Sequence, residues 1–304
     1  MDTNSTQSRS RGGEDIALSA CADTARELDR ERWLASGLAP RRGRDDLAVL
    51  LAFNAEVART RDVVSEPILG RIRLQWWRDT IEAAGAAPGI VPGDPAVAAV
   101  LSHPVADGLA RLFAQGALAP ADLLPLVDAR EAELDDTGPG DIDSFLAHID
   151  ATAGTLNRAA LRVLGVDTDA AREAADHAAR AYGIAGQMRA TAVNAARGPV
   201  TLPHDLLDRY GVTESALRVG KPPAGLASVA RTLAERAHRH ADAARQLRRD
   251  VPATALPVLV TVRFARGHLA RLARADFDLF SPRLEPTPAA TPLAVLATML
   301  TGRY

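Results

Sequence analysis

The sequence predicts an all-α protein built as one domain, with many helices packed around a shared interior. Apolar residues recur at three- and four-residue spacing along most of the 304-residue chain, which is the period of an amphipathic helix. Alternating β-branched runs with hairpin turns are missing. The linkers, such as TGPGD and GKPPAG, are short and rich in proline or glycine, and none resembles a hinge between independent domains.

The N-terminal part of the chain predicts a tail followed by three helices. The polar residues 1–16 lack an apolar stretch and are expected to form a disordered tail. A first helix is expected over 17–36. A second starts near Arg44 and carries leucines at helical spacing. A third follows Ser65-Glu66-Pro67, where a capping serine, an acid and a proline favour a helix start, and it ends before the Gly/Pro stretch 85–95.

Apolar periodicity and the Pro/Gly linkers place the remaining helices. They are expected at 95–115, 120–135, 142–164, 168–191, 226–249, 255–275 and 292–301, with short helices at 202–210 and 214–218. The helical domain is therefore expected to extend from residue 17 to residue 304.

Composition and charge exclude several classes of function. The formal net charge is −2, so the chain has no basic field for nucleic acid. The longest apolar runs are far shorter than the roughly 20 residues that a membrane span needs. A soluble protein is expected, with room for peripheral contact with a membrane. Cys21 is the only cysteine, which leaves neither a disulfide framework nor a cysteine metal cluster.

Polar side chains interrupt the apolar face of the second helix. Asn54, Ala58, Arg61 and Asp62 lie three, four or eight residues apart and are expected to share one inward-facing side with the leucines. A buried amide or guanidinium needs a partner. That partner is either a neighbouring helix or a ligand, and the sequence leaves both open.

Two further helices carry candidate ligand-binding residues. On the third helix, Arg73 lies near Trp77, a pattern found in cores and interfaces as well as beside ligands. In GQMRATAVN, Gln187, Ala190 and Asn194 share a side. Acids at the last two of these positions would form a D-x-x-x-D pair able to bind Mg²⁺, and the chain has neither acid.

Several catalytic motifs are missing from the chain. The histidines form no H-E-x-x-H pattern, and G-x-S-x-G, the P-loop and G-x-G-x-x-G are absent. Zinc proteases, serine hydrolases and P-loop enzymes are therefore excluded, and we expect no metal site.

Two quoted stretches carry a resemblance to a known family. AFNAEVARTRDVVSEPILGRIRLQWWRD (52–79) and QMRATAVNAARGPVTLPHDLLDRYGV (187–212) resemble the two motif regions of the squalene/phytoene synthase family. Segments 26–40, 154–166 and 263–284 resemble its N-terminal, central and C-terminal helices. The resemblance covers nearly the whole chain after about residue 18. It implies an isoprenoid-synthase-like helical bundle around a central cavity.

The family's chemistry is only partly compatible with this chain. Catalytic members join two prenyl diphosphates head to head, with Mg²⁺ held by two aspartate-rich motifs. In the first motif the leading acids fall on Ala58 and Arg59, and only Asp62 is kept. In the second they fall on Ala190 and Asn194. The resemblance therefore implies a degenerate metal site, with no cofactor expected and Mg²⁺ only if the chain is a prenyltransferase.

Other residues of the two regions remain candidates for binding an anion or lining a cavity, with the arginines as remnants of a diphosphate site. They are Asn54, Arg61, Arg73, Trp77, Gln187, Arg189 and Arg197.

A non-catalytic branch of the family departs from the motifs in the same way. The stretches FNAEVARTRDVVSEP, LQWWRD and QMRAT are similar to the mitochondrial complex I assembly factor 6 group and its bacterial relatives. The resemblance implies a role in assembling the respiratory NADH dehydrogenase, with complex I subunits or assembly proteins as partners. No mitochondrial presequence is evident, so a bacterial cytoplasmic setting is expected, with peripheral contact at the inner membrane.

Three functions stay open at this point. The favoured one is a non-catalytic protein that aids complex I assembly. The alternatives are a divergent head-to-head prenyltransferase and a protein that binds an isoprenoid or lipid without chemistry. Removing one preorganised electrostatic group typically lowers a rate by about 10²–10³, and several metal ligands are missing here. The chain is therefore expected not to be an enzyme.

Overall fold

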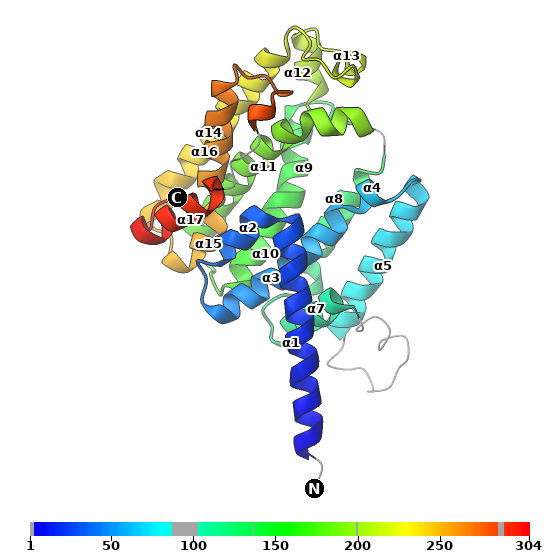
Figure 1. Ribbon diagram of the computed structural model, residues 1–304, viewed down its shortest axis with the longest axis vertical. Coiled ribbons are helices and arrows are strands. Elements are labelled where there is room, and N and C mark those ends of the chain that lie inside the picture. Colours follow the sequence, from blue (N-terminus) through cyan, green and yellow to red (C-terminus); the bar gives the residue numbers. More distant parts are fainter. Residues whose placement is uncertain (1–2, 87–102, 136, 199, 285–288) are drawn as a thin grey trace. The chain divides into compact units, whose positions relative to one another are not determined.

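The computed structural model describes residues 3–86, 103–135, 137–198, 200–284 and 289–304. Within these ranges the regular structure is helical and contains no strand, which confirms the all-α fold class (Figure 1). Packing divides the chain into two compact units. Unit 1 comprises Met1–Leu134 and Ala159–Val166, and unit 2 comprises Asp135–Arg158 and Asp167–Tyr304. The single domain expected over residues 17–304 stays a prediction.

Unit 1 is built around one buried helix, α3. Its elements are α1 (Thr3–Leu28), α2 (Arg30–Ser36), α3 (Arg41–Ala58), α4 (Thr60–Val63), α5 (Pro67–Ala86), α7 (Pro104–Ala114), the 3₁₀ turn η2 (Pro120–Asp122) and α8 (Leu124–Ala132). Helix α3 contacts α1, α2, α7 and α8, and every residue from Asp46 to Ala55 is buried. The buried Asp46 carboxylate is paired at 2.7 Å with Arg111 of α7, which compensates for its loss of hydration.

The N-terminal half differs from the sequence prediction at two places. Helix α1 begins at Thr3, so the structure describes helix within residues 3–16, where a tail was predicted. The predicted first helix is divided at Asp29, whose carboxylate accepts a hydrogen bond from the backbone N–H of Arg32 and caps α2.

The predicted second helix is also divided, and this changes the site. Helix α3 ends at Ala58, Arg59 connects it to the short helix α4, and Val64 is extended. The prediction that Arg61 and Asp62 continue the inward face of α3 is therefore wrong. The chain must turn here to enter α5, and Asp62 is exposed.

Unit 2 is organised along the long helix α11. Its elements are α9 (Ile142–Ile149), the π turn η3 (Asp150–Gly154), the first part of α10 (Thr155–Val163), α11 (Asp169–Arg197), α12 (His204–Arg209), α13 (Glu214–Arg218), α14 (Leu226–Gln246), η4 (Leu247–Arg249), η5 (Ala253–Ala255), α15 (Leu256–Leu259), α16 (Thr261–Arg274), η6 (Pro282–Leu284) and α17 (Ala290–Thr301). Helices α11, α14 and α16 lie side by side (Figure 1).

Alanine determines how closely the helices of unit 2 approach. The hydroxyl of Thr168 accepts from the N–H of Ala171 at 3.2 Å and so starts α11. The inner faces of α11 and α14 are then lined by small side chains that are all buried. They are Ala171, Ala174, Ala175, Ala178 and Ala181 on α11, and Ala230, Ala234, Ala237 and Ala241 on α14. Small residues let two helix backbones pack closely along their length.

The remaining predicted helices are found, but some are divided: 142–164 into α9, η3 and α10, and 255–275 into η5, α15 and α16. Helix α13 has the predicted bounds, and the expected helix at 292–301 begins slightly earlier, at Ala290. The expected helix at 95–115 corresponds to α7 from Pro104 onward, and residues 95–102 lie outside the described residues.

The close contact between α11 and α9 at Gly183 can be tested by adding a methyl group there. A Cβ added at Gly183 would lie 2.6 Å from Cγ2 of Ile149, whereas one added at Gly186 would meet nothing within 4 Å. Gly183→Ala should therefore lower the free energy of unfolding by about 1–2 kcal/mol, because overpacking outweighs the gain in helix propensity.

Gly186→Ala is the matched control and should be neutral or stabilising by up to about 1 kcal/mol. Denaturant titration followed by circular dichroism measures both variants. Equal stability of the two variants would contradict the packing described for α11 and α9.

Candidate functional site

The first motif region lies in unit 1, where α3 meets α4. Asn54 is buried on α3, and Ala58 is the last residue of that helix. Arg59 is exposed, with its guanidinium 3.9 Å from the carboxylate of Glu56. Asp62 is exposed on α4. The helix break thus separates Asn54, which faces the interior, from the one carboxylate that the motif keeps.

Arg73 and Trp77 of α5 have structural roles in unit 1. The Arg73 guanidinium is ion-paired with the Glu56 carboxylate. The Trp77 ring is buried, and its centroid lies 5.3 Å from that of Phe53 in an edge-to-face contact. It also lies 5.4 Å from His103, where desolvation by burial lowers the pKa of the imidazole. Arg61, the other candidate in this region, is half-buried on α4.

The second motif region is the last part of α11 in unit 2. Gln187, Ala190 and Asn194 are half-buried, and the amide nitrogen of Asn194 donates to the Thr201 hydroxyl at 3.2 Å. Arg197 is exposed at the last position of α11. The amide of Asn194, at a position where the resemblance implies an acid in the synthases, therefore has a partner within the protein.

A buried histidine connects Arg189 to the neighbouring helix. Nη1 of Arg189 lies 3.2 Å from Nε2 of His268, and Nη2 of Arg271 lies 2.5 Å from Nδ1 of the same ring. His268 is buried on α16. A neutral imidazole accepts a hydrogen bond at only one nitrogen, so the ring cannot satisfy both guanidinium groups as an acceptor. No motif in the sequence marks His268 as a site residue.

A small apolar pocket adjoins this cluster in unit 2. Besides Arg189 and His268, it is lined by Ala185, Met188, Leu269, Leu272, Leu279 and Leu284. Its volume of about 10 Å³ corresponds to roughly one water molecule.

The side chains at the motif positions do not fit a Mg²⁺ cluster. Magnesium ions are bound by hard oxygen ligands, usually carboxylates. Ala58 and Ala190 offer no donor atom, Arg59 is a cation, and Asn194 offers only an amide oxygen. Asp62 supplies the one carboxylate of the five positions. Across the described ranges, no three His, Cys, Asp or Glu side chains gather closely enough to hold a metal ion.

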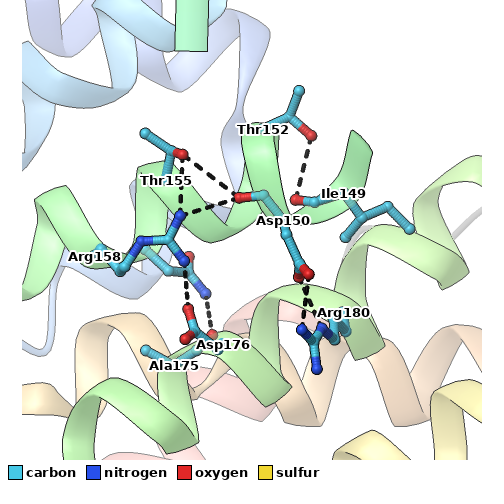
Figure 2. A network of polar contacts seen from close by, with 9 residues as sticks. Ile149, Asp150, Thr152, Thr155, Arg158, Ala175, Asp176 and Arg180 are labelled. Carbon is cyan, nitrogen blue, oxygen red and sulfur yellow. Dashed lines mark hydrogen bonds and ion pairs between the residues drawn. The ribbon is translucent and has the colours of Figure 1, made fainter. Parts of the chain in front are cut away.

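A charged network joins α11 to the π turn η3, and the sequence analysis did not anticipate it. Figure 2 shows Asp150 held at two points by different arginines. Nε and Nη2 of Arg180 donate to the two carboxylate oxygens of Asp150 at 2.8 and 2.7 Å. Nη2 of Arg158 donates to the Asp150 carbonyl at 3.2 Å, and its Nη1 is paired with Asp176 at 2.7 Å.

This network stabilises an irregular piece of helix. A π turn disturbs the regular bonding of backbone carbonyls, and such turns occur frequently at functional sites. The Thr155 hydroxyl and Arg158 both donate to the Asp150 carbonyl, and Thr152 donates to the His148 carbonyl. The hydrogen bond with Asp150 raises the pKa of Arg180, which keeps the guanidinium charged.

Two histidines lie next to the network. Nδ1 of His177 on α11 lies 3.0 Å from Nδ1 of His240 on α14. Burial, followed by the charges of His177, Arg180 and Arg236, lowers the pKa of His240 from 6.5 to about 4. Burial also lowers the pKa of His177. The pair is therefore neutral near pH 7, with one nitrogen donating and the other accepting.

Comparison with known sequences identifies relatives along most of the chain. The sequence profile described as squalene/phytoene synthase matches residues 25–290. A mouse protein named NADH dehydrogenase (ubiquinone) complex I, assembly factor 6 is 30% identical over 284 residues, which cover 93% of this chain and 82% of that protein. The human protein of the same name is 31% identical over 273 residues, which cover 90% and 79% of the two chains.

Solved structures of lower identity share the fold. A dehydrosqualene synthase in complex with a ligand superposes with a TM-score of 0.78 at 14% identity, over 93% of this chain and 95% of that chain. The squalene synthase HpnC from Alicyclobacillus acidocaldarius superposes with a TM-score of 0.73 at 18% identity, over 87% and 96% of the two chains. At these identities the likeness establishes the fold alone.

The ion pair between Asp150 and Arg180 can be tested by a double-mutant cycle. Both side chains are partly shielded and make two parallel hydrogen bonds, so their coupling energy should be about 1 kcal/mol. The cycle uses Asp150→Asn, Arg180→Gln and the double variant, with unfolding measured in denaturant.

The Asp169–Arg172 pair at the start of α11 is the matched control, because its acid is almost fully exposed. We expect no measurable coupling there. A coupling at Asp150–Arg180 no larger than in this control would show that the network adds nothing to the stability of α11.

The lowered pKa of His240 should make the stability of the protein depend on pH. His240 titrates near 4 in the folded chain and near 6.5 when unfolded, so the unfolded chain binds more protons between these values. Stability should therefore fall as the pH decreases from 6.5 towards 4. For each protein, the free energy of unfolding at low pH is compared with its own value at pH 7.5. The loss should be smaller in His240→Gln than in the wild type. An unchanged pH dependence in the variant would contradict the neutral state of the pair.

Proposed function

Because the chain belongs to the squalene/phytoene synthase family, we propose that it is a non-catalytic member that aids assembly of respiratory complex I. The proposal combines the family fold with a site that does not retain the family's metal-binding chemistry. The fold alone does not decide between the two functions, because the same fold also supports prenyl transfer.

The observation that carries the proposal is the donor set at the two motif positions. Ionisation of a prenyl diphosphate needs its leaving group neutralised by metal ions and cationic side chains. Alanine at 58 and 190, arginine at 59 and asparagine at 194 leave Asp62 as the only carboxylate among the five motif positions, and Asp62 is exposed. One exposed carboxylate is too little negative charge to collect several dications. Arg189 and Arg197 therefore remain as cations without the metal half of a diphosphate site.

The relatives support an assembly role. Those at 30–31% identity over most of the chain carry the name of a complex I assembly factor, whereas the synthases of similar fold are only 14–18% identical. The proposal extends that named role to this chain. Its partners would then be complex I subunits or other assembly proteins.

An exposed apolar face on unit 1 also supports a role in protein contact. On α5, Ile68, Leu69, Ile72 and Trp76 are exposed large apolar side chains, and 68, 72 and 76 recur every four residues along one side of the helix. Exposed apolar patches of this kind commonly mark protein-interaction sites. We propose that a complex I subunit binds to this face. The protein would act in a bacterial cytoplasm, at the inner membrane. It would need no bound cofactor.

The assembly role can be tested in cells that make this chain. Deleting its gene should lower the amount and activity of complex I, and the wild-type chain should restore both. Asp62→Asn should restore them equally well, because the proposal assigns no metal-binding task to the one remaining motif carboxylate. Quantitative native gels and NADH oxidation by isolated membranes measure the outcome.

Trp77→Ala serves as the control for loss of function, since removing a fully buried aromatic side chain typically costs about 3–5 kcal/mol. Two results would refute the proposal. One is a deletion strain with normal complex I. The other is failure of Asp62→Asn to restore complex I although the variant accumulates and folds like the wild type.

A further inference from the structure

We propose that α17 is a docking helix for an anionic lipid surface. In this arrangement its leucine side lies at the boundary between headgroups and acyl chains, and arginines at its C-terminal end contact lipid phosphates. The inference concerns unit 2 alone and does not rest on the assembly role.

The outward side of α17 is a continuous apolar arc. Leu293, Leu296, Met299 and Leu300 are 61%, 49%, 69% and 76% exposed. Positions 0, 3, 6 and 7 of a helix lie on one side of it. The helix, with sequence ATPLAVLATMLT, carries no charged residue between Ala290 and Thr301. We refer to these four side chains as the leucine arc.

The inward side of α17 is the more polar one. Thr291 and Thr298 are the buried residues of this helix, and the Thr298 hydroxyl is fully buried. A helix that serves only the core of its own protein places leucine inward and threonine outward. The reversed polarity of α17 indicates that its apolar side is covered by something other than unit 2.

The chain after α17 anchors this orientation. Tyr304 is buried, and its hydroxyl donates to the Ala244 carbonyl of α14 at 3.2 Å. Burial raises the pKa of Tyr304 to about 12, so the hydroxyl keeps its proton. Helix α17 also contacts α16. These contacts hold the helix on unit 2 and leave the leucine arc pointing away from it.

Arginines gather where α17 ends. Arg303 follows the helix, and Nη1 of Arg263 on α16 donates to the Arg303 carbonyl at 3.3 Å. Arg248 of η4 lies close enough to Tyr304 to act on its pKa. In the part of the chain that the structure describes, no side-chain carboxylate forms an ion pair with any of these three arginines. Their charges complement anionic lipid headgroups, and each basic residue near such a surface contributes to binding.

The helix is also too short to insert across a bilayer. Twelve residues of helix span about 18 Å, whereas the hydrocarbon core is about 30 Å thick. Of the helices in the described ranges, none combines the length and apolar character needed to cross a membrane. A helix that lies in the plane of the interface can bury the leucine arc among acyl chains and place the arginines beside lipid phosphates.

Vesicle co-sedimentation of the full chain tests this proposal. The probes are vesicles of pure phosphatidylcholine and vesicles containing 30% phosphatidylglycerol. The wild type should bind the anionic vesicles, and added salt should weaken the binding. Leu296→Ser with Leu300→Ser should reduce the partition coefficient at least about tenfold, because two apolar side chains lose their contact with lipid. Arg263→Gln should reduce it roughly fivefold.

Val219→Ser is the matched control, since Val219 is 72% exposed but lies after α13, away from α17 in sequence, and it should bind like the wild type. Circular dichroism and sedimentation velocity on the same samples report folding and oligomeric state. Three results would overturn the proposal: no binding of the wild type to anionic vesicles, equal binding of the wild type and the double leucine variant, or a wild-type dimer that the double leucine variant dissociates.

Discussion

The close approach of α11 to α14 and α16 is the constraint on which unit 2 depends. Alanine on both α11 and α14 permits it, and the space left between the helices admits no unpaired charge. The half-buried ionisable side chains Asp176, His177 and Arg180 in the middle of α11 are paired or neutral. Arg180 is paired with Asp150, Asp176 with Arg158, and His177 is held uncharged against His240. The contacts of Arg180 and Arg158 hold the π turn η3 against α11.

The C-terminal part of α11 carries cationic side chains and no carboxylate. Beyond Asp176, α11 carries no carboxylate, and it ends with Arg189 and Arg197. In a synthase, arginines at such a site would share the diphosphate with bound metal ions. Here Arg189 contacts His268, and the asparagine at 194 is hydrogen-bonded to Thr201. We propose that the chain keeps the family fold without the electrostatic requirement for metal-assisted prenyl transfer, and the assembly proposal rests on this contrast.

Local patterns in the sequence predicted the helices well and their interactions poorly. The spacing of leucines and the Pro/Gly linkers placed nearly every helix, because periodicity reports which side of a helix is buried. The break at Arg59 escaped prediction since Ala58, Arg59 and Thr60 contain no residue that interrupts a helix. The contact between Arg189 and His268 joins residues 79 positions apart, and no local signal reports such a pairing. The reversed polarity of α17 was equally hidden, because periodicity alone cannot say which face meets the protein.

Release of diphosphate measures most directly whether this chain lacks metal-assisted prenyl chemistry. The purified chain would be incubated with farnesyl or geranylgeranyl diphosphate and saturating Mg²⁺, and pyrophosphate followed over time. The donor set at positions 58, 59, 62, 190 and 194 predicts a rate equal to that of the protein-free blank. Sustained release above the blank that disappears when Asp62 is changed to Asn would contradict the account, because it would show that this carboxylate still assembles a working metal site.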